Sequence, residues 1–291
     1  MHLSRIRGAV SAIVALAAAA APPAGGQDQP AGTRPGWPCV GAVDPVYVQS
    51  AEATGGRVLM LHPSELDAPG AGAVSVGASG HDATLVRVVG QLESGLHEFD
   101  VPIDSTVESV NFFVSLQCLQ LVGIAGPTGR EVGDGDPSVS EDHRFDAIRF
   151  VTLTRPEPGR WKIIVAGKGL FFMIVTARTG LSLGGLVFLD QGRRIDTAGH
   201  GVSLPEAGRP QRVEVRVDGA AGPVAFRLIS SSAATLQTLS LEESGHEPGR
   251  RTYTGSVTLP ASGSRLAATG LDERGFPFQR VDPRLVLTAS N

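Results

Sequence analysis

The clearest pattern in the sequence is the alternation of apolar and polar residues along short segments. Val110, Phe112, Val114, Leu116 and Cys118 share one parity over nine residues. Side chains two residues apart on a β-strand point to the same face, so this segment predicts a strand with Cys118 on its core side. Similar alternation predicts further strands in residues 98–104, 148–153, 160–165, 170–176, 213–218 and 252–259.

Two of these strands carry specific expectations. In residues 98–104, the apolar side chains face one way and the acids Glu98, Asp100 and Asp104 face the other. In residues 160–165, Trp161 shares its parity with apolar residues, so we expect its ring in the core of a sandwich rather than on a ligand-binding surface.

Turn-forming residues separate the predicted strands. Residues 167–169 (Gly-Lys-Gly) predict a tight hairpin turn, residues 130–147 an acidic loop, and residues 46–48 and 57–61 extended segments. No segment shows a helical period over 11 or more residues. Many short strands between turns are typical of sandwiches, so we expect an all-β protein with two β-sandwich domains in series, residues 71–180 and 181–291.

The N-terminal residues 1–26 have the pattern of a secretory signal peptide. His2, Arg5 and Arg7 precede an apolar run over residues 9–21, and two prolines follow it. The run is shorter than the ~20 residues of a spanning helix. We therefore expect a secreted protein, extracellular or periplasmic, with no transmembrane span in the mature chain; the alternative is an uncleaved anchor.

Cleavage of this segment is a testable expectation. The small residues after the apolar run predict a mature N-terminus between Ala20 and Gln27. N-terminal sequencing of the exported protein measures it directly. An intact Met1 on a soluble cytoplasmic form would contradict the prediction.

Charge excludes one class of partner. The full chain has 25 Lys and Arg against 29 Asp and Glu. Removing residues 1–26 takes away two arginines and no acids, which leaves 23 against 29, a net charge of −6. Without a basic block or an aromatic stacking platform, the sequence indicates no nucleic-acid partner.

The two cysteines, Cys39 and Cys118, could form a disulfide in an oxidising compartment. The alternative is that Cys118 is a buried free thiol and that Cys39 belongs to a free arm, since residues 27–45 are rich in Pro and Gly and are expected to be a linker. No Cys-x-x-Cys or Cys/His cluster is present, which argues against structural zinc.

Two short motifs suggest sites, each with a simpler interpretation. Residues 136–140 fit the D-x-S-x-S metal string, and Asp134, Asp136 and Asp142 are a weak Ca²⁺ candidate, although a solvated acidic loop is favoured. Residues 180–184 fit G-x-S-x-G, but an apolar strand pattern follows where a nucleophile elbow needs a helix. An interdomain turn is the favoured interpretation there.

Three landmarks resemble the extracellular region that follows the von Willebrand A domain in hemicentin and in von Willebrand factor A domain-containing protein 7. They are residues 51–58 (AEATGGRV), residues 99–116, and residues 156–163 (PEPGRWKI). The resemblance implies that residues 46–70 are the exit of an A domain, followed by a galactose-binding-like jelly-roll sandwich and an immunoglobulin-like sandwich. The A domain itself is missing, so metal-dependent adhesion is not implied, and the fold name establishes no sugar ligand.

Together these features favour a secreted, non-catalytic recognition or adhesion protein without a cofactor, whose ligand is a protein or a glycan outside the cytoplasm. One alternative is a carbohydrate-binding accessory module, but two Trp and two Tyr leave few aromatics for a sugar platform. The other is a hydrolase with a dispersed site, for which no motif is present.

Overall fold

The computed structural model describes residues 39–72, 82–133, 135–190, 193–195 and 205–286. This part of the chain is mostly β-structure arranged in antiparallel sheets, with the helix α1 (Pro45–Thr54) and a short 3-10 helix (Pro63–Glu65) near its start. The prediction of an all-β protein built from sandwiches is confirmed.

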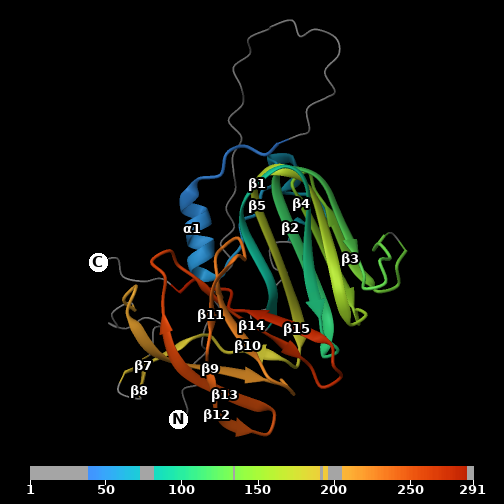
Figure 1. Cartoon of the computed structure of the whole chain (residues 1–291). Helices are drawn as coiled ribbons and strands as arrows, with labels where there is room; N and C mark the ends of the chain where they lie inside the picture. Colours follow the sequence, from blue (N-terminus) through green and yellow to red (C-terminus); the bar gives the residue numbers. More distant parts are fainter. Residues whose placement is uncertain (1–38, 73–81, 134, 191–192, 196–204, 287–291) are drawn as a thin grey trace, which may run out of the picture.

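The first sheet has the strand order β1-β5-β2-β4-β3, and all its neighbours are antiparallel (Figure 1). Three of its strands are unusually long. The bounds are β1 (Ala83–Ile103), β2 (Val107–Ala125), β3 (Val139–Arg144), β4 (Ile148–Thr154) and β5 (Gly159–Thr179).

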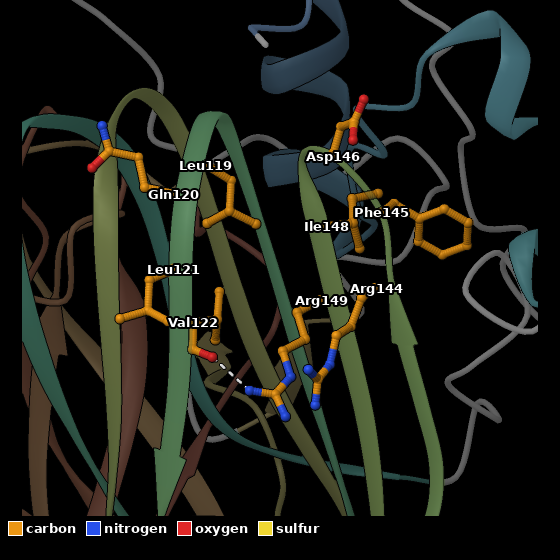
Figure 2. Close-up of a pocket in the computed structure, with 9 residues that line it drawn as sticks. All are labelled: Leu119, Gln120, Leu121, Val122, Arg144, Phe145, Asp146, Ile148 and Arg149. Carbon is orange, nitrogen blue, oxygen red and sulfur yellow. Dashed lines mark hydrogen bonds between the residues drawn. The ribbon is translucent and has the colours of Figure 1, made fainter. Parts of the chain in front are cut away.

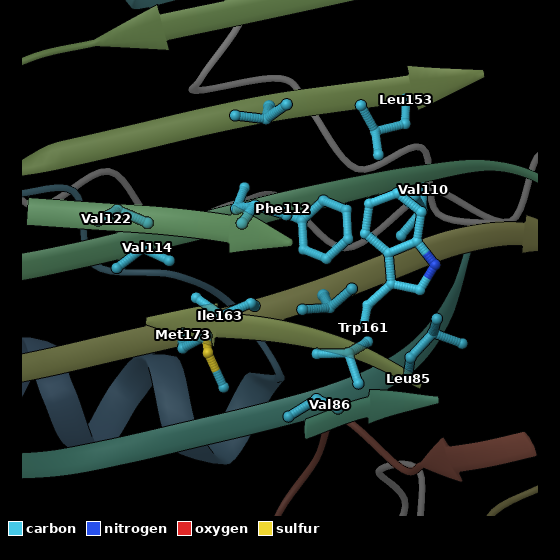
Figure 3. Close-up of a cluster of buried hydrophobic side chains, with 14 of the residues drawn as sticks. Leu85, Val86, Val110, Phe112, Val114, Val122, Leu153, Trp161, Ile163 and Met173 are labelled. Carbon is cyan, nitrogen blue, oxygen red and sulfur yellow. The ribbon is translucent and has the colours of Figure 1, made fainter. Parts of the chain in front are cut away.

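This sheet folds over on itself to make a sandwich. Phe112 of β2 pairs in register with Val175, yet its ring lies 5.9 Å from that of Trp161, which is fourteen residues earlier on β5 (Figure 3). A straight strand of fourteen residues would span about 46 Å, so β5 must double back. Register shifts occur at the bend, between Leu116 and Cys118 on β2.

Glycine allows the bend. Gly167 has φ +146°, and a Cβ there would lie 2.3 Å from the Cys118 carbonyl oxygen. The backbones of β5 and β2 therefore approach more closely than a side chain permits. The predicted hairpin turn at residues 167–169 is wrong: the Gly-Lys-Gly sequence bends one continuous strand instead of reversing the chain between two.

The interior between the two halves of the folded sheet is the first core. Trp161 is 5% exposed in this core, as the sequence predicts. The other large members of this core are Leu85, Ile103, Phe112, Leu116, Ile124, Leu153, Ile163, Phe171 and Met173.

Helix α1 and the segment after it cover the outer face of the sheet. Asp44 caps the helix by accepting from Val46 N (2.9 Å), Pro45 occupies the first turn, and Gly55 ends it with φ +74°. Beyond the helix, the buried side chains of residues 58–61 pack on Phe113, Phe150 and Phe172 of the sheet. This double coverage explains why the strands there are apolar on both faces.

The second sandwich consists of two sheets facing one another. One has the order β11-β10-β14-β15, and the other β12-β13-β9-β7-β8, with β6 also pairing with β9. The bounds are β6 (Ser182–Leu183), β7 (Val187–Asp190), β8 (Arg193–Ile195), β9 (Pro210–Asp218), β10 (Ala225–Ile229), β11 (Thr235–Leu239), β12 (Glu242–Glu247), β13 (Arg250–Thr258), β14 (Arg265–Leu271) and β15 (Pro277–Val281). Val213, Val215 and Val217 are fully buried in its core, as their alternation predicts.

Buried ion pairs join the two sandwiches. Glu52 of α1 contacts Arg87 of β1 (2.9 Å) and Arg265 of β14 (2.7 Å), and Asp104, just after β1, contacts Arg280 of β15 (2.6 Å). Asp104 is fully buried, so its expected place on the polar face of a strand is wrong. The strand ends at Ile103, and the next residue turns into the seam between the sandwiches.

Two other local expectations are also wrong. Residues 46–48 are helical, because the Asp-Pro start and the Gly stop outweigh an apolar alternation only three residues long. The acidic loop contains strand β3, whose polar side chains hide the strand pattern.

The structure joins Cys39 to Cys118 by a disulfide, so residue 39 is not on a free arm. Next to it, Val40 is buried and donates from its backbone N to the Gln117 carbonyl (2.9 Å). The bond ties the segment before α1 to the bend of β2.

Reduction of this disulfide is expected to lower the free energy of unfolding by about 2–4 kcal/mol, because it releases the unfolded chain from a closed loop of 79 residues. Urea unfolding with and without reductant measures the change. The double variant Cys39→Ser/Cys118→Ser is the control, and reductant should not affect it. Recovery of both cysteines alkylated without prior reduction would contradict the pairing.

Candidate binding pocket

A pocket of about 380 Å³ opens on the first sandwich where β2 and β4 separate. This is within the size range of small-ligand sites. Figure 2 shows its lining, which comes from β2 and from the β3–β4 hairpin: Leu119, Gln120, Leu121, Val122, Arg144, Phe145, Asp146, Ile148 and Arg149.

The bend of the sheet creates the pocket. β2 pairs with β4 from Ser109 to Ser115. After the register shift at Leu116, β2 follows β5 into the other half of the sandwich, while β4 begins at Ile148 and stays behind. A gap is therefore left between residues 119–122 and the start of β4.

Most of the pocket wall is apolar. Leu119, Val122, Phe145 and Ile148 contribute the wall, and Leu121 lies at the rim with 51% of its surface exposed. Leu121 is among the large apolar residues that the described structure leaves open to water. Burial of such surface by a ligand would be favourable.

The other end of the pocket is basic. Arg144 of β3 lies directly opposite Arg149 of β4 in the strand register. Like charges in directly opposed positions are destabilising. Asp142, two residues before Arg144 and therefore on the same face, offsets this by contacting Arg144 (2.8 Å) and Arg149 (3.0 Å).

Arg149 bridges the two halves of the sandwich. Its side chain is only 8% exposed, and Nη1 donates to the Val122 carbonyl oxygen, as the dashed line in Figure 2 marks. Burial disfavours the charged form of Asp142, but hydrogen bonds from Arg144 and Arg149 prevail and hold the pKa of that carboxyl below its ordinary value. Asp142 therefore contacts both guanidinium groups.

An acidic residue stands at the opposite rim. Asp146 lies 3.8 Å from His62, and its carboxylate points away from the two guanidinium groups (Figure 2). Glu65 holds this corner in place by accepting from Asp146 N and His62 N, both at 2.8 Å. Arginine does not give up its proton near neutral pH, so the basic end of the pocket cannot transfer a proton.

The described acids of the Ca²⁺ candidate serve other contacts. Asp142 contacts the two arginines of the pocket, and Asp136 accepts from Ser138 N (2.9 Å) and Ser138 Oγ (2.7 Å). Asp134 lies outside the described residues. Among the residues that the structure describes, no cluster of three or more His, Cys, Asp or Glu side chains is placed to hold a metal ion.

The G-x-S-x-G motif does not form a nucleophile elbow. Ser182 lies on β6, and its Oγ is 3.4 Å from Asp218 of the paired strand β9. Within the described residues, no helix has the length and apolar content needed to cross a membrane.

Sequence reasoning missed the pocket. The apolar segment that begins at Ile148 predicts one strand of the pocket, but the sequence predicts a loop over residues 130–147, which include Asp142 and Arg144. Arg144 and Arg149 lie opposite each other only in the observed register of β3 and β4. The sequence of a strand that is polar on both faces specifies its register weakly.

No family model matches the chain, and no curated protein matches it. Among solved structures, it is similar to a lipase of Bacillus licheniformis in its propeptide form, at 12% identity and a TM-score of 0.29 over 68% of this chain and 43% of the lipase chain. It is also similar to a β-glucuronidase of Bifidobacterium dentium complexed with coumarin-3-O-glucuronide, at 8% identity and a TM-score of 0.21 over 64% of this chain and 38% of the other. The chain thus spans less than half the length of either protein, and likenesses this distant carry no argument about its function.

Proposed function

We propose that the chain is an exported, non-catalytic recognition protein that binds a small ligand, or a small group on a larger partner, in the pocket between β2 and β4. One observation carries the proposal: an apolar cavity ends at two arginines that the strand register holds face to face. A mostly apolar pocket with a few convergent polar groups is the usual form of a ligand site.

The chemistry of the pocket favours binding over catalysis. Its guanidinium groups are committed to Asp142, and its rim acid is paired with His62. Export is supported by the N-terminal segment and by the disulfide between Cys39 and Cys118. The resemblance to the region that follows A domains in hemicentin agrees with a recognition or adhesion role.

The carbohydrate-module alternative needs aromatic rings exposed as a platform for sugars. Trp161 and Tyr253 are both buried in sandwich cores. Tyr47 is 40% exposed on α1 but is not part of the pocket lining, in which Phe145 is the aromatic residue. We therefore favour recognition of a ligand less polar than a sugar over the carbohydrate-binding alternative.

A fragment screen by saturation-transfer NMR on the whole exported chain tests the proposal. We expect hits that the Leu121→Glu variant loses, since a carboxylate at the rim would disfavour occupation of an apolar cavity. Leu271→Glu is the matched control, because Leu271 is 53% exposed on the second sandwich, and it should keep the hits.

If the wild type and Leu121→Glu bind the same fragments, the assignment of ligand binding to this pocket would be contradicted. Turnover of ester or glycoside substrates by the wild type, reduced in Leu121→Glu, would overturn the non-catalytic assignment and favour the hydrolase alternative.

A further inference from the structure

We propose that the chain has a second binding surface, independent of the pocket described above: a groove between the two sandwiches that binds an acidic peptide segment of a partner protein. The groove has a volume of about 590 Å³, within the size range of ligand sites. It lies where β15 packs against β1. Its lining comes from β1 and β5 of the first sandwich, and from β10, β14, β15 and the residues just before β10 in the second.

Two arginines without an ion pair line this groove. Arg160 of β5 lies opposite Pro102 of β1, and Arg227 belongs to β10. Within the residues that the structure describes, neither guanidinium group makes an ion pair or a side-chain hydrogen bond. Each sandwich therefore supplies one cation that no protein carboxylate contacts.

One acid, Asp100, also lines the groove. In the register of β1 and β5 it lies opposite Lys162, not opposite Arg160. The lining thus holds two cations and one anion, and it has more positive than negative charge. A partner that carries carboxylates complements this charge, and such complementarity selects a partner against others.

The other accessible residues of the lining are mainly apolar. Leu271 is 53% exposed, Pro223 is exposed, and Val224 is half-buried. A partner can cover these side chains without any change in the two cores, and removal of their surface from water is favourable. A segment that combines carboxylates with apolar side chains therefore fits the groove.

Hydrogen bonds across the seam hold the two walls of the groove in place. Gln279, which is part of the lining, donates from Nε2 to the Leu85 carbonyl oxygen (3.0 Å). Next to Leu271, the Asp272 carboxylate accepts from Ser105 N (2.7 Å). The groove is therefore formed before a partner arrives, which lowers the entropic cost of binding.

A peptide fits this lining better than an anionic polysaccharide, which would also complement the arginines. A sugar would need an exposed aromatic ring to pack on, but Phe278, the aromatic residue of the lining, is only 1% exposed. A peptide supplies carboxylates and apolar side chains from one short segment. The observations therefore favour a peptide of a partner protein.

A library of random heptapeptides displayed on phage and selected on the whole exported chain tests the proposal. We expect the selected peptides to combine Asp or Glu with apolar residues. Added salt should weaken the binding of synthetic copies of these peptides. Selection of peptides rich in Lys or Arg, or of no peptide, would overturn the proposal.

Two variants locate the binding site of the synthetic peptides. Arg227→Gln should weaken binding about tenfold, because a charge-assisted hydrogen bond to a half-buried guanidinium group is lost. Arg160→Gln should weaken it about threefold, since contacts between exposed charges are weaker. Neither change breaks an ion pair among the described residues, so both variants should fold like the wild type.

Arg212→Gln is the matched control for the loss of one positive charge. Arg212 is exposed on β9, which belongs to the other sheet of the second sandwich, and it is not part of the groove lining. The variant should bind the peptides like the wild type. An equal loss of affinity in Arg212→Gln and Arg227→Gln would show a general attraction of acidic peptides and would overturn the groove as their site.

Leu271→Glu separates this groove from the pocket between β2 and β4. A carboxylate on the groove wall should strongly reduce peptide binding, while the variant keeps the fragments that Leu121→Glu loses. Peptide binding that neither Leu271→Glu nor Arg227→Gln reduces would overturn the groove and leave the pocket proposal standing. Binding of polygalacturonate that Arg227→Gln reduces, with no peptide selected, would overturn the peptide assignment in favour of an anionic glycan.

Discussion

The variant Asp104→Asn is expected to unfold with a free energy about 3–5 kcal/mol lower than that of the wild type, the usual cost of leaving one member of a buried ion pair without its partner. Asp104 and Arg280 are both almost inaccessible to water, and their side chains are 2.6 Å apart. Arg280 also donates to the Leu181 carbonyl (2.8 Å) and to Thr179 Oγ1 (2.9 Å). The guanidinium is thus fixed at the seam and cannot turn to solvent when its counterion is removed.

Asparagine removes the charge of Asp104 but keeps a hydrogen-bond acceptor, because its side-chain oxygen can still accept from Thr106 N, as Asp104 Oδ1 does. Urea unfolding followed by circular dichroism measures the change. Asp100→Asn is the matched control, since Asp100 is an exposed acid on β1, four residues earlier, and should change stability by less than about 0.5 kcal/mol.

The double variant Asp104→Asn/Arg280→Met adds a second test. Replacing both members of a buried pair by groups without charge is often close to neutral, so it should recover most of the lost stability. Equal stability of Asp104→Asn and Asp100→Asn would contradict the importance of this ion pair.

The variant Trp161→Ala is expected to have the second large effect. It should lower the free energy of unfolding of the first sandwich by about 3–5 kcal/mol. The ring fills the space between the halves of the folded sheet, where it packs against Phe112 (Figure 3). Its Nε1 donates to the Glu157 carbonyl at 2.8 Å. Trp161 has no part in the separate core of the second sandwich.

Differential scanning calorimetry of the two-sandwich protein measures this effect. The conservative Trp161→Phe keeps most of the apolar contact and should lose much less stability than Trp161→Ala. An unchanged melting profile for Trp161→Ala, together with loss of ligand binding, would instead identify Trp161 as a recognition residue.

The parts of the fold that the sequence predicts are those with strong local patterns. Val213, Val215 and Val217 alternate with charged residues, and all three face the core. Trp161 follows a turn and shares its parity with Ile163, and both are buried. Period-two alternation is a local property, so one strand is enough to reveal it.

The parts that it does not predict depend on residues far apart in the chain. A Gly-Lys-Gly sequence fits a hairpin or a bend equally well, and the partner strands β1 and β2 decide between them. The sequence around Asp104 does not distinguish it from an exposed acid, because its burial depends on the ion pair with Arg280, 176 positions later in the chain. The pocket arises in the same way, because its two arginines oppose each other only after β3 pairs with β4.

Recognition through the pocket between β2 and β4 is tested most directly by a crystal structure of the exported chain soaked with the fragments that the saturation-transfer screen finds. The expected result is a fragment bound in this pocket, in contact with Leu121 at its rim. A structure in which this pocket is empty and the fragments lie only elsewhere, such as in the groove lined by Pro102 and Phe278 between the sandwiches, would contradict the proposed site.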